Sequence, residues 1–254
     1  MRNAHQLVHS RTRVGGRFAL MPLEGYPASR LPTWPDAQVK VLASPALGAQ
    51  FVQLLIDLPA GKRGMFDKDG HTETFYFVLA GAGQVIDEAG DVTNVRPGSF
   101  GLTAPGRQVT YVAGDSMKFL LVRKSYQSAT DIKLFSSLHG HESDVTKQVW
   151  GDNPHSLLQT LIPDDFAYDM AMNIFTFDPG FGLPIVETHV MEHGLYFLQG
   201  RGLYYLDKEW MEVEADDFIW MGPYCPQSFY ATGPTASRYL YYKNVNRDIP
   251  HWRV

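Results

Sequence analysis

Short segments of alternating apolar and polar residues run through most of the chain, which is the pattern of half-buried β-strands. Aromatic residues are concentrated in these segments, and Gly, Pro, Asn or Asp bounds each of them. Many short strands separated by turn residues predict an all-β sandwich or barrel. The clearest segments are FVQLLIDL (51–58), TFYFVLAG (74–81), MNIFTFD (172–178), HGLYFLQG (193–200), DDFIWMG (216–222) and ASRYLYYKNV (236–245).

Three blocks of this pattern occur twice along the chain at a nearly constant offset. The matched positions are Pro59 with Pro179, Gly81 with Gly200, and Phe100 with Phe218, which lie 120, 119 and 118 residues apart. A fixed offset of this size indicates internal duplication rather than chance similarity. We therefore expect two tandem β-barrel modules.

Breaks in the strand pattern divide the chain into four segments. Residues 126–165 are more polar and lack the strand rhythm, so we interpret them as a connector that contains a short helix. Residues 1–40 are irregular and rich in turn residues, which indicates an arm that covers a barrel. The predicted organisation is an N-terminal arm (1–40), an N-terminal module (41–125), the connector (126–165) and a C-terminal module (166–254).

Composition excludes several classes of protein. With 44% hydrophobic and 19% charged residues, the 254-residue chain is globular rather than disordered. A net charge of −5 argues against a nucleic-acid partner, and the single cysteine, Cys225, excludes a disulfide framework or a Cys-rich zinc site. No apolar run reaches the roughly 18–20 residues of a membrane helix, and the first residues do not resemble a secretory signal. We therefore expect a cytoplasmic protein with a small-molecule partner.

The most informative polar cluster lies in the second half of the chain, in Glu187-x-His189-x3-His193. Side chains at positions i and i+2 of a strand point to the same face, so Glu187 and His189 point together, and His193 joins them if a short turn intervenes. Ionisable groups directed into an apolar barrel are costly unless they bind something, and a divalent cation would satisfy them. The alternative is a strand whose polar residues face solvent.

This cluster resembles the cupin motif G-x5-H-x-H-x3,4-E-x6-G. The spacing to Gly200 is the same, but Glu187 replaces the first motif His and His193 replaces the motif Glu. Gln227 stands where cupins have a fourth, later ligand. The resemblance implies a metal site formed by Glu187, His189, His193 and Gln227. The matching positions of the first module carry no such set, which implies a structural or assembly role for that module; they are Lys68, Gly70, Thr74 and Val109.

The resemblance extends to one family of two-module cupins, the (S)-ureidoglycine aminohydrolases. It is carried by residues 187–210, the segment FIWMGPYCPQ (218–227), the closing KNVNRD (243–248), and the first-module segments SPALGAQFVQ (44–53) and ETFYFVLAG (73–81). It implies two tandem jelly-roll cupin modules, a Mn²⁺ cofactor and a homo-oligomer. The implied reaction is the hydrolytic release of ammonia from (S)-ureidoglycine to give ureidoglycolate, a step of allantoin and purine catabolism.

The last strand adds further candidate site residues. Strand alternation places Tyr239, Tyr241 and Lys243 on one face. The resemblance implies that Tyr239 and Lys243 contact the substrate and take part in catalysis with Glu187. It also implies that Gln227 and Tyr204 bind the substrate. The alternative for the tyrosines is core packing, and for Lys243 a solvated strand edge.

Two other functions are compatible with the sequence. One is a metal-dependent dioxygenase or isomerase on the same two-module scaffold, and the other is a non-catalytic protein that binds small molecules. Other candidate clusters carry less weight. His139-Gly-His141-Glu142 lies in the polar connector, and His71 and Glu73 miss the ligand positions of the motif.

Overall fold

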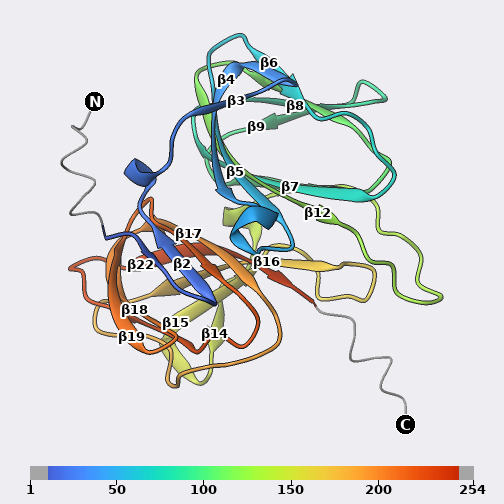
Figure 1. The fold of residues 1–254 in the computed structure, drawn as a ribbon. Coiled ribbons are helices and arrows are strands. Elements are labelled where there is room, and N and C mark those ends of the chain that lie inside the picture. The colour runs from blue at the N-terminus through green and yellow to red at the C-terminus, as the bar shows by residue number, and fades with distance from the viewer. Residues whose placement is uncertain (1–10, 246–254) are drawn as a thin grey trace. The chain divides into compact units, whose positions relative to one another are not determined.

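The computed structural model describes residues 11–245, so residues 1–10 of the predicted arm and residues 246–254 lie outside it. Almost all its regular structure is β (Figure 1). Helical structure within residues 11–245 is limited to three short 3-10 turns, at Leu23–Gly25, Pro45–Leu47 and Glu142–Asp144. None of the helices in this range could cross a membrane. The predicted all-β fold class is confirmed.

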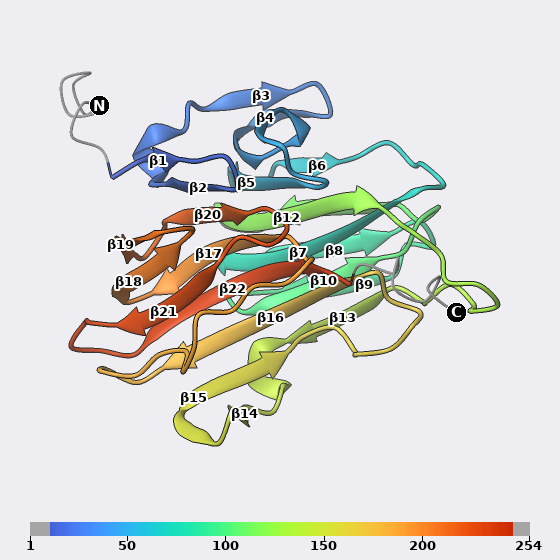
Figure 2. The same cartoon turned by 60° about the horizontal axis from the view of Figure 1, so that its bottom comes forward.

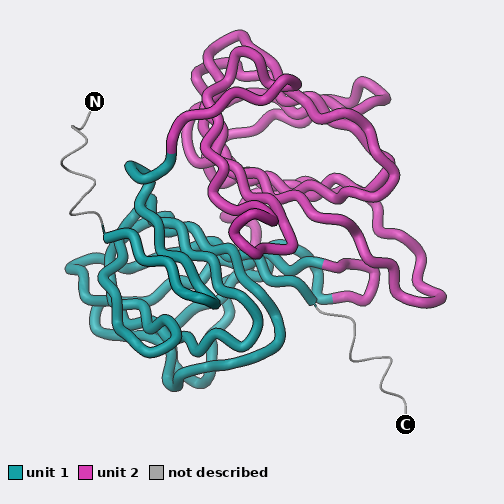
Figure 3. Tube along the Cα trace, viewed as in Figure 1, with its two compact units in different colours: residues 1–26, 146–164, 170–254 teal, residues 27–145, 165–169 magenta. Residues whose placement is uncertain are grey.

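The described chain forms two compact units of β-structure (Figure 3). The C-terminal unit contains residues 11–26, 146–164 and 170–245. The N-terminal unit contains residues 27–145 and 165–169. Each unit has its own buried hydrophobic cluster, so each buries its apolar strand faces internally.

Two antiparallel sheets make up the C-terminal unit, and residues from both contribute to its core (Figure 2). The larger sheet has the order β1 (Arg13–Val14), β2 (Phe18–Met21), β20 (Phe218–Met221), β17 (His193–Gln199), β22 (Ser237–Asn244), β16 (Met170–Phe177), β15 (Asn153–Thr160) and β14 (Gln148–Trp150). The smaller sheet has the order β19 (Glu209–Glu214), β18 (Arg201–Leu206) and β21 (Gln227–Ala231).

The N-terminal unit is built in the same way. Its larger sheet has the order β13 (Leu138–His141), β10 (Ser99–Thr103), β7 (Thr72–Ala80), β12 (Met117–Ser125), β5 (Val52–Leu58), β4 (Trp34–Ala43) and β3 (Ser29–Leu31). Its smaller sheet has the order β6 (Arg63–Met65), β11 (Val109–Ala113), β8 (Gly83–Asp87) and β9 (Val92–Val95).

Strand order confirms the internal duplication. The run β10-β7-β12-β5-β4 in the N-terminal unit corresponds to β20-β17-β22-β16-β15 in the C-terminal unit. The repeated glycines of the sequence, Gly81 and Gly200, follow the equivalent strands β7 and β17, and both have positive φ angles. Each glycine therefore allows the tight turn that leads into the smaller sheet.

The limits of the two units differ from the segment boundaries that the sequence indicates. Strand β2, in the predicted arm, pairs with β20 of the C-terminal unit. Strand β3 and the part of β4 that falls in the predicted arm belong instead to the N-terminal unit. The predicted connector is also divided, because β13 joins one unit while β14 and β15 join the other. In place of the expected short helix, the connector holds these strands and a single 3-10 turn. Backbone pairing makes this possible, since β13 and β14 lie at sheet edges, where a strand needs no regular apolar pattern.

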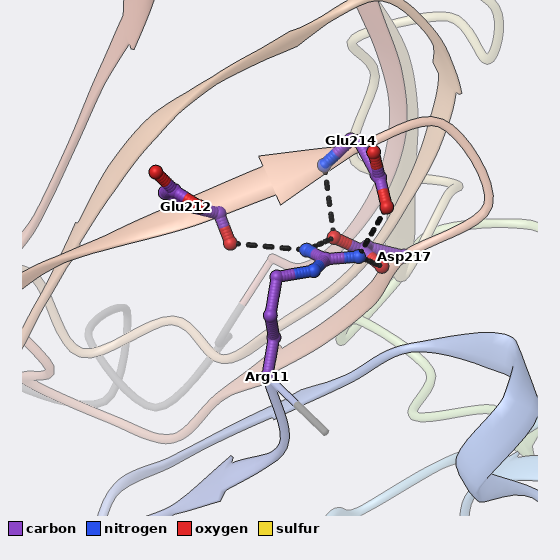
Figure 4. A network of polar contacts seen from close by, with 4 residues as sticks. All are labelled: Arg11, Glu212, Glu214 and Asp217. Carbon is purple, nitrogen blue, oxygen red and sulfur yellow. Dashed lines mark hydrogen bonds and ion pairs between the residues drawn. The ribbon is translucent and has the colours of Figure 1, made fainter. Parts of the chain in front are cut away.

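An ion-pair network attaches the start of the described chain to the C-terminal unit (Figure 4). Arg11 contacts both carboxylate oxygens of Asp217, and it also donates to Glu214 Oε1 at 2.8 Å and to the Glu212 carbonyl oxygen at 3.1 Å. Asp217 is buried and also accepts a hydrogen bond from the backbone N–H of Glu214. The network therefore satisfies a buried carboxylate and secures the segment that leads into β1 and β2.

Glycine at position 81 is required by space as well as by backbone angle. A Cβ atom at Gly81 (φ +74°) would lie 1.9 Å from the Ser116 carbonyl oxygen. Gly90 (φ +89°) provides a matched control, because a Cβ atom there meets no other atom within 4 Å. We expect Gly81→Ala to lower the free energy of unfolding by about 3 kcal/mol or more, and Gly90→Ala by about 1 kcal/mol, in urea titrations. Equal losses would contradict the close approach at Gly81.

Candidate active site

A cavity of about 500 Å³ opens into the C-terminal unit. It is lined by all seven residues that the sequence analysis selects for the site, namely Glu187, His189, His193, Tyr204, Gln227, Tyr239 and Lys243. Apolar side chains form much of the remaining wall, including Trp150, Phe175, Leu183, Ile185, Val186, Leu195 and Met221. The structure thus places a small set of polar groups inside a mostly apolar recess, which is the usual make-up of a small-molecule site.

Strand β22 positions one side of the cavity. It lies between β17 and β16, and its residue Lys243 pairs directly with His193, the first residue of β17. The alternation of the strand directs Tyr239, Tyr241 and Lys243 to the cavity, as the sequence predicts. Neither Tyr239 nor Tyr241 is therefore merely a core residue, and Lys243 is not on a solvated edge.

Glu187 and His189 reach the cavity from a loop, not from the strand that the sequence predicts. Glu187 and His189 do not belong to a regular strand, because residues 178–192 form a loop that precedes β17. The loop is attached at Glu187, whose N–H donates to the Gln227 carbonyl oxygen at 2.8 Å, while the Gln227 N–H donates back at 2.9 Å. This isolated bridge, rather than strand alternation, brings Glu187 next to Gln227.

Three nitrogen-bearing side chains converge in the cavity. The Nε2 atom of His189 lies 3.2 Å from Nε2 of His193 and 3.0 Å from the side-chain amide nitrogen of Gln227. The Nδ1 atom of His193 lies 3.1 Å from the Tyr242 carbonyl oxygen, so Nδ1 carries the proton and Nε2 presents a lone pair. A backbone carbonyl behind an imidazole is a frequent means of orienting a metal-binding histidine.

Burial keeps both histidines neutral. The pKa of His193 is lowered to about 3, first by desolvation and then by the nearby His189. The pKa of His189 is also lowered, mainly by burial and additionally by the charge of Lys243. In contrast, burial raises the pKa of Glu187 more than the attraction of Lys243 lowers it. The cavity therefore disfavours charge and presents neutral imidazole donors.

The donor set fits a divalent cation. Two imidazole nitrogens about 3 Å apart match neighbouring ligands at about 2.1 Å from one ion. Rotation of the Gln227 side-chain amide by half a turn would point its oxygen, instead of its nitrogen, towards His189. Tyr204 now donates to the amide oxygen at 3.2 Å, and after the rotation its hydroxyl would accept from the amide nitrogen. Glu187 lines the same cavity, although no three His, Cys, Asp or Glu side chains within residues 11–245 form a preassembled cation site.

Two tyrosines form a hydrogen-bonded chain behind Gln227. The Tyr239 hydroxyl bonds to Tyr204, and the Tyr204 hydroxyl donates to Gln227 Oε1. Both side chains are almost fully buried, and burial raises the pKa of each well above its usual value. Both hydroxyls therefore remain protonated and hold the Gln227 side chain in the cavity wall.

The equivalent part of the N-terminal unit is filled. The ring of Trp34 packs against Phe66, Tyr111 and Phe119, with centroid distances between 5.4 and 5.9 Å. The cavity that remains there has a volume of about 20 Å³. At the motif positions, Lys68 is an exposed residue paired with Glu88, Gly70 is exposed, and Thr74 and Val109 are buried.

The remaining candidate clusters have other contacts. His139 Nδ1 lies 2.9 Å from the Tyr76 hydroxyl, and His141 bonds to the Pro97 carbonyl oxygen and to Ser143. Glu73 is buried, 3.7 Å from the Lys124 ammonium, while His71 is exposed. Each of these residues is thus part of a local structural contact.

The sequence analysis did not assign the apolar wall of the cavity, of which Trp150 is the least expected member, and it gave no role to Tyr241. Trp150 comes from the predicted connector, at the end of β14, and packs edge-on against Phe175 with a centroid distance of 5.5 Å. Tyr241 was placed on the correct face, but it received no role. The sequence signal for Trp150 is the presence of a tryptophan in a largely polar connector.

Solved structures of other proteins show which fold class this chain has. No family model matches the chain. The fold matches a cupin 2 conserved barrel domain protein from Leptotrichia buccalis with a TM-score of 0.62 at 15% identity, over 89% of this chain and 95% of that one. The crystal structure of protein Ylba from E. coli matches with a TM-score of 0.84 at 30% identity, over 97% of this chain and 98% of the other. The molecule has a two-module cupin fold.

A curated relative identifies the family within this class. The (S)-ureidoglycine aminohydrolase of Escherichia coli strain K12 is 33% identical over 240 residues, which are 92% of this chain and 90% of the relative. The chain belongs to the (S)-ureidoglycine aminohydrolase family. The family resemblance that the sequence motifs indicate is thereby confirmed.

The lowered pKa of His193 predicts how the metal-free protein responds to acid. The pKa of about 3 lies below the value of about 6.5 for an unfolded histidine, so the unfolded chain binds the proton more tightly. The resulting stability is present above pH 6.5 and is lost as the pH falls towards 3.

We expect metal-free wild type to lose about 2 kcal/mol more unfolding free energy between pH 7 and pH 5 than His193→Gln does. Urea unfolding in the presence of a chelator measures the difference. Exposed His71 supplies the control, because His71→Gln should lose as much as wild type. If His193→Gln also loses as much as wild type, His193 is not buried in its neutral form.

Proposed function

We propose that this protein is a Mn²⁺-dependent (S)-ureidoglycine aminohydrolase. The observation that carries the proposal is the convergence of His189, His193 and Gln227 in one cavity that also contains Glu187 and Lys243. In the proposed reaction, water adds its oxygen to the substrate carbon as the carbon–nitrogen bond to the amino group breaks. The products are ureidoglycolate and ammonia.

Each polar group of the cavity has a role that its surroundings support. Lys243 binds the substrate carboxylate, because it is the one cationic side chain among the lining residues. Glu187, whose pKa is raised by burial, takes the proton from water and returns it to the departing amine. Tyr239 and Tyr204 keep Gln227 in place and offer their oxygens to the substrate. The apolar wall excludes bulk water and strengthens these interactions.

Four residues would hold the metal, namely Glu187, His189, His193 and Gln227. When bound, Mn²⁺ supplies Lewis acidity and a fixed charge that orients the substrate. Oxygen and imidazole donors together suit Mn²⁺, and they also accept Fe²⁺, Co²⁺ and Ni²⁺. A homo-oligomeric state and a cytoplasmic location remain predictions from the sequence.

Metal binding is tested by removing one ligand. We expect His189→Ala to weaken metal affinity by at least about 100-fold, because a cation loses an inner donor. Elemental analysis of purified protein and an ammonia-release assay on freshly prepared ureidoglycine measure the effect. An enzyme-free control is needed because the substrate decays spontaneously, and exposed His155 supplies a matched variant, His155→Ala, that should keep its metal. Full metal content in His189→Ala would refute the site.

The role of Lys243 is tested separately from the metal. We expect Lys243→Met to retain metal and to lower kcat/KM by about 100-fold, because the substrate carboxylate loses its charged partner. Lys208→Met, at an exposed turn, is the control and should behave as wild type. An oxygen electrode run with the ammonia assay tests the dioxygenase alternative, since hydrolysis consumes no oxygen. Wild-type kinetics in Lys243→Met would remove this residue from the site.

A further inference from the structure

Among the residues that line the cavity, Tyr241 carries a hydroxyl to which the proposed reaction gives no role. The other hydroxyls that line the cavity are already engaged. Tyr239 bonds to Tyr204, Tyr204 donates to Gln227 at 3.2 Å, and Thr188 donates to the Tyr224 carbonyl oxygen at 3.2 Å. Tyr241 lines the same cavity without a bond to any of these groups.

The ring of Tyr241 is held firmly in the cavity wall. It stacks on Phe175 with a centroid distance of 5.6 Å and an angle of 14° between the ring planes. It also packs edge-on against His193, at a centroid distance of 5.6 Å. Backbone pairing on both sides, to Leu195 in β17 and to Asn173 in β16, fixes its position along the strand. The hydroxyl therefore has little freedom to move.

Asn173 lies directly opposite Tyr241 on the neighbouring strand β16. It is 6% exposed, and its side chain bonds to the Tyr241 oxygen. Burial raises the pKa of the Tyr241 hydroxyl, and the bond from Asn173 offsets part of this rise, which is the effect of a donated N–H. The other polar atom of this amide, Oδ1, has no partner and is buried. Because a tyrosine hydroxyl has one O–H and Asn173 donates to its oxygen, the O–H remains free to donate to a ligand in the cavity that Tyr241 lines.

The proposed substrate contains one strong acceptor that the other residues leave unassigned. Lys243 binds its carboxylate, and Glu187 serves the amino group that departs. The carbonyl oxygen of the ureido group remains. Tyr241 and Lys243 lie two residues apart on one face of a strand, a separation of roughly 7 Å. This separation suits the two ends of a small ureido acid.

We propose that Tyr241 determines specificity for ureido acids by donating a hydrogen bond to the ureido carbonyl oxygen, and that Asn173 positions its hydroxyl. The inference rests on the proposed function, because it takes the substrate class from it. A site built around such a donor discriminates against analogues that lack the acceptor, since the buried hydroxyl would then be left without a partner.

Two stable probes test this donor without turnover. N-carbamoylglycine has the carboxylate and the ureido carbonyl, whereas guanidinoacetate has the carboxylate but no carbonyl oxygen. We expect Tyr241→Phe to weaken binding of N-carbamoylglycine to the Mn²⁺-loaded protein by about fivefold to tenfold and to leave guanidinoacetate binding unchanged, as measured by titration calorimetry. Tyr230→Phe, at a largely exposed position, is the matched control and should bind both probes as wild type does.

Metal content distinguishes this role from a structural one. Tyr241→Phe keeps the ring that packs on His193 and Phe175, so its metal stoichiometry should equal that of wild type. Unchanged N-carbamoylglycine affinity in Tyr241→Phe would overturn the proposal. Equal weakening of both probes, or no N-carbamoylglycine binding by wild type, would also overturn it.

A double-mutant cycle tests the positioning role of Asn173. If Asn173 acts through Tyr241, Asn173→Ala alone should weaken N-carbamoylglycine binding, and the double variant with Tyr241→Phe should bind no more weakly than Tyr241→Phe does. Additive losses would refute positioning by Asn173.

The ammonia assay separates this inference from the proposed function. If wild type releases ammonia from ureidoglycine but Tyr241→Phe binds N-carbamoylglycine normally, the function stands and the inference fails. If wild type releases no ammonia but Tyr241→Phe selectively loses N-carbamoylglycine, the proposed reaction is wrong and the ureido-acid site stands.

Discussion

The register of strand β22 is the constraint on which the cavity depends. This strand pairs with β17 on one side and β16 on the other, so backbone hydrogen bonds fix it over its whole length. Its inward residues include Lys243 and Tyr241, and the carbonyl group of Tyr242, between them, orients His193. A slip of one residue would turn these side chains away from the cavity and remove that carbonyl contact.

Burial determines the chemistry of the cavity once the strands are in place. The apolar wall keeps His193 neutral and disfavours ionisation of Glu187. The imidazole therefore offers its lone pair to a cation, whereas Glu187 binds a proton more readily than an exposed carboxylate does. The same burial is a cost to the metal-free fold, because polar groups are held out of water. Function and stability therefore make opposite demands on this part of the sheet.

Duplication supplied two similar frameworks, and side-chain volume made them different. In the C-terminal unit, His193 of β17 pairs with Lys243 of β22. At the equivalent positions of the N-terminal unit, Thr74 of β7 pairs with Arg123 of β12. Trp34, the first residue of β4, fills the N-terminal barrel together with other aromatic rings. At equivalent positions, the cavity has a volume of about 20 Å³ in the N-terminal unit and about 500 Å³ in the C-terminal unit. One framework packs a core where the other contains a recess.

The sequence by itself determined the strands, their duplication and the polar residues of the site, because alternation and motif spacing are local properties of the chain. The tertiary structure decided which edge each irregular segment joins, since backbone pairing of β2, β14 and β15 needs no side-chain pattern. It therefore placed Trp150 in the cavity wall, Glu187 against Gln227 and Asn173 beside Tyr241. Contacts between residues distant in sequence depend on strand register, which no local pattern encodes.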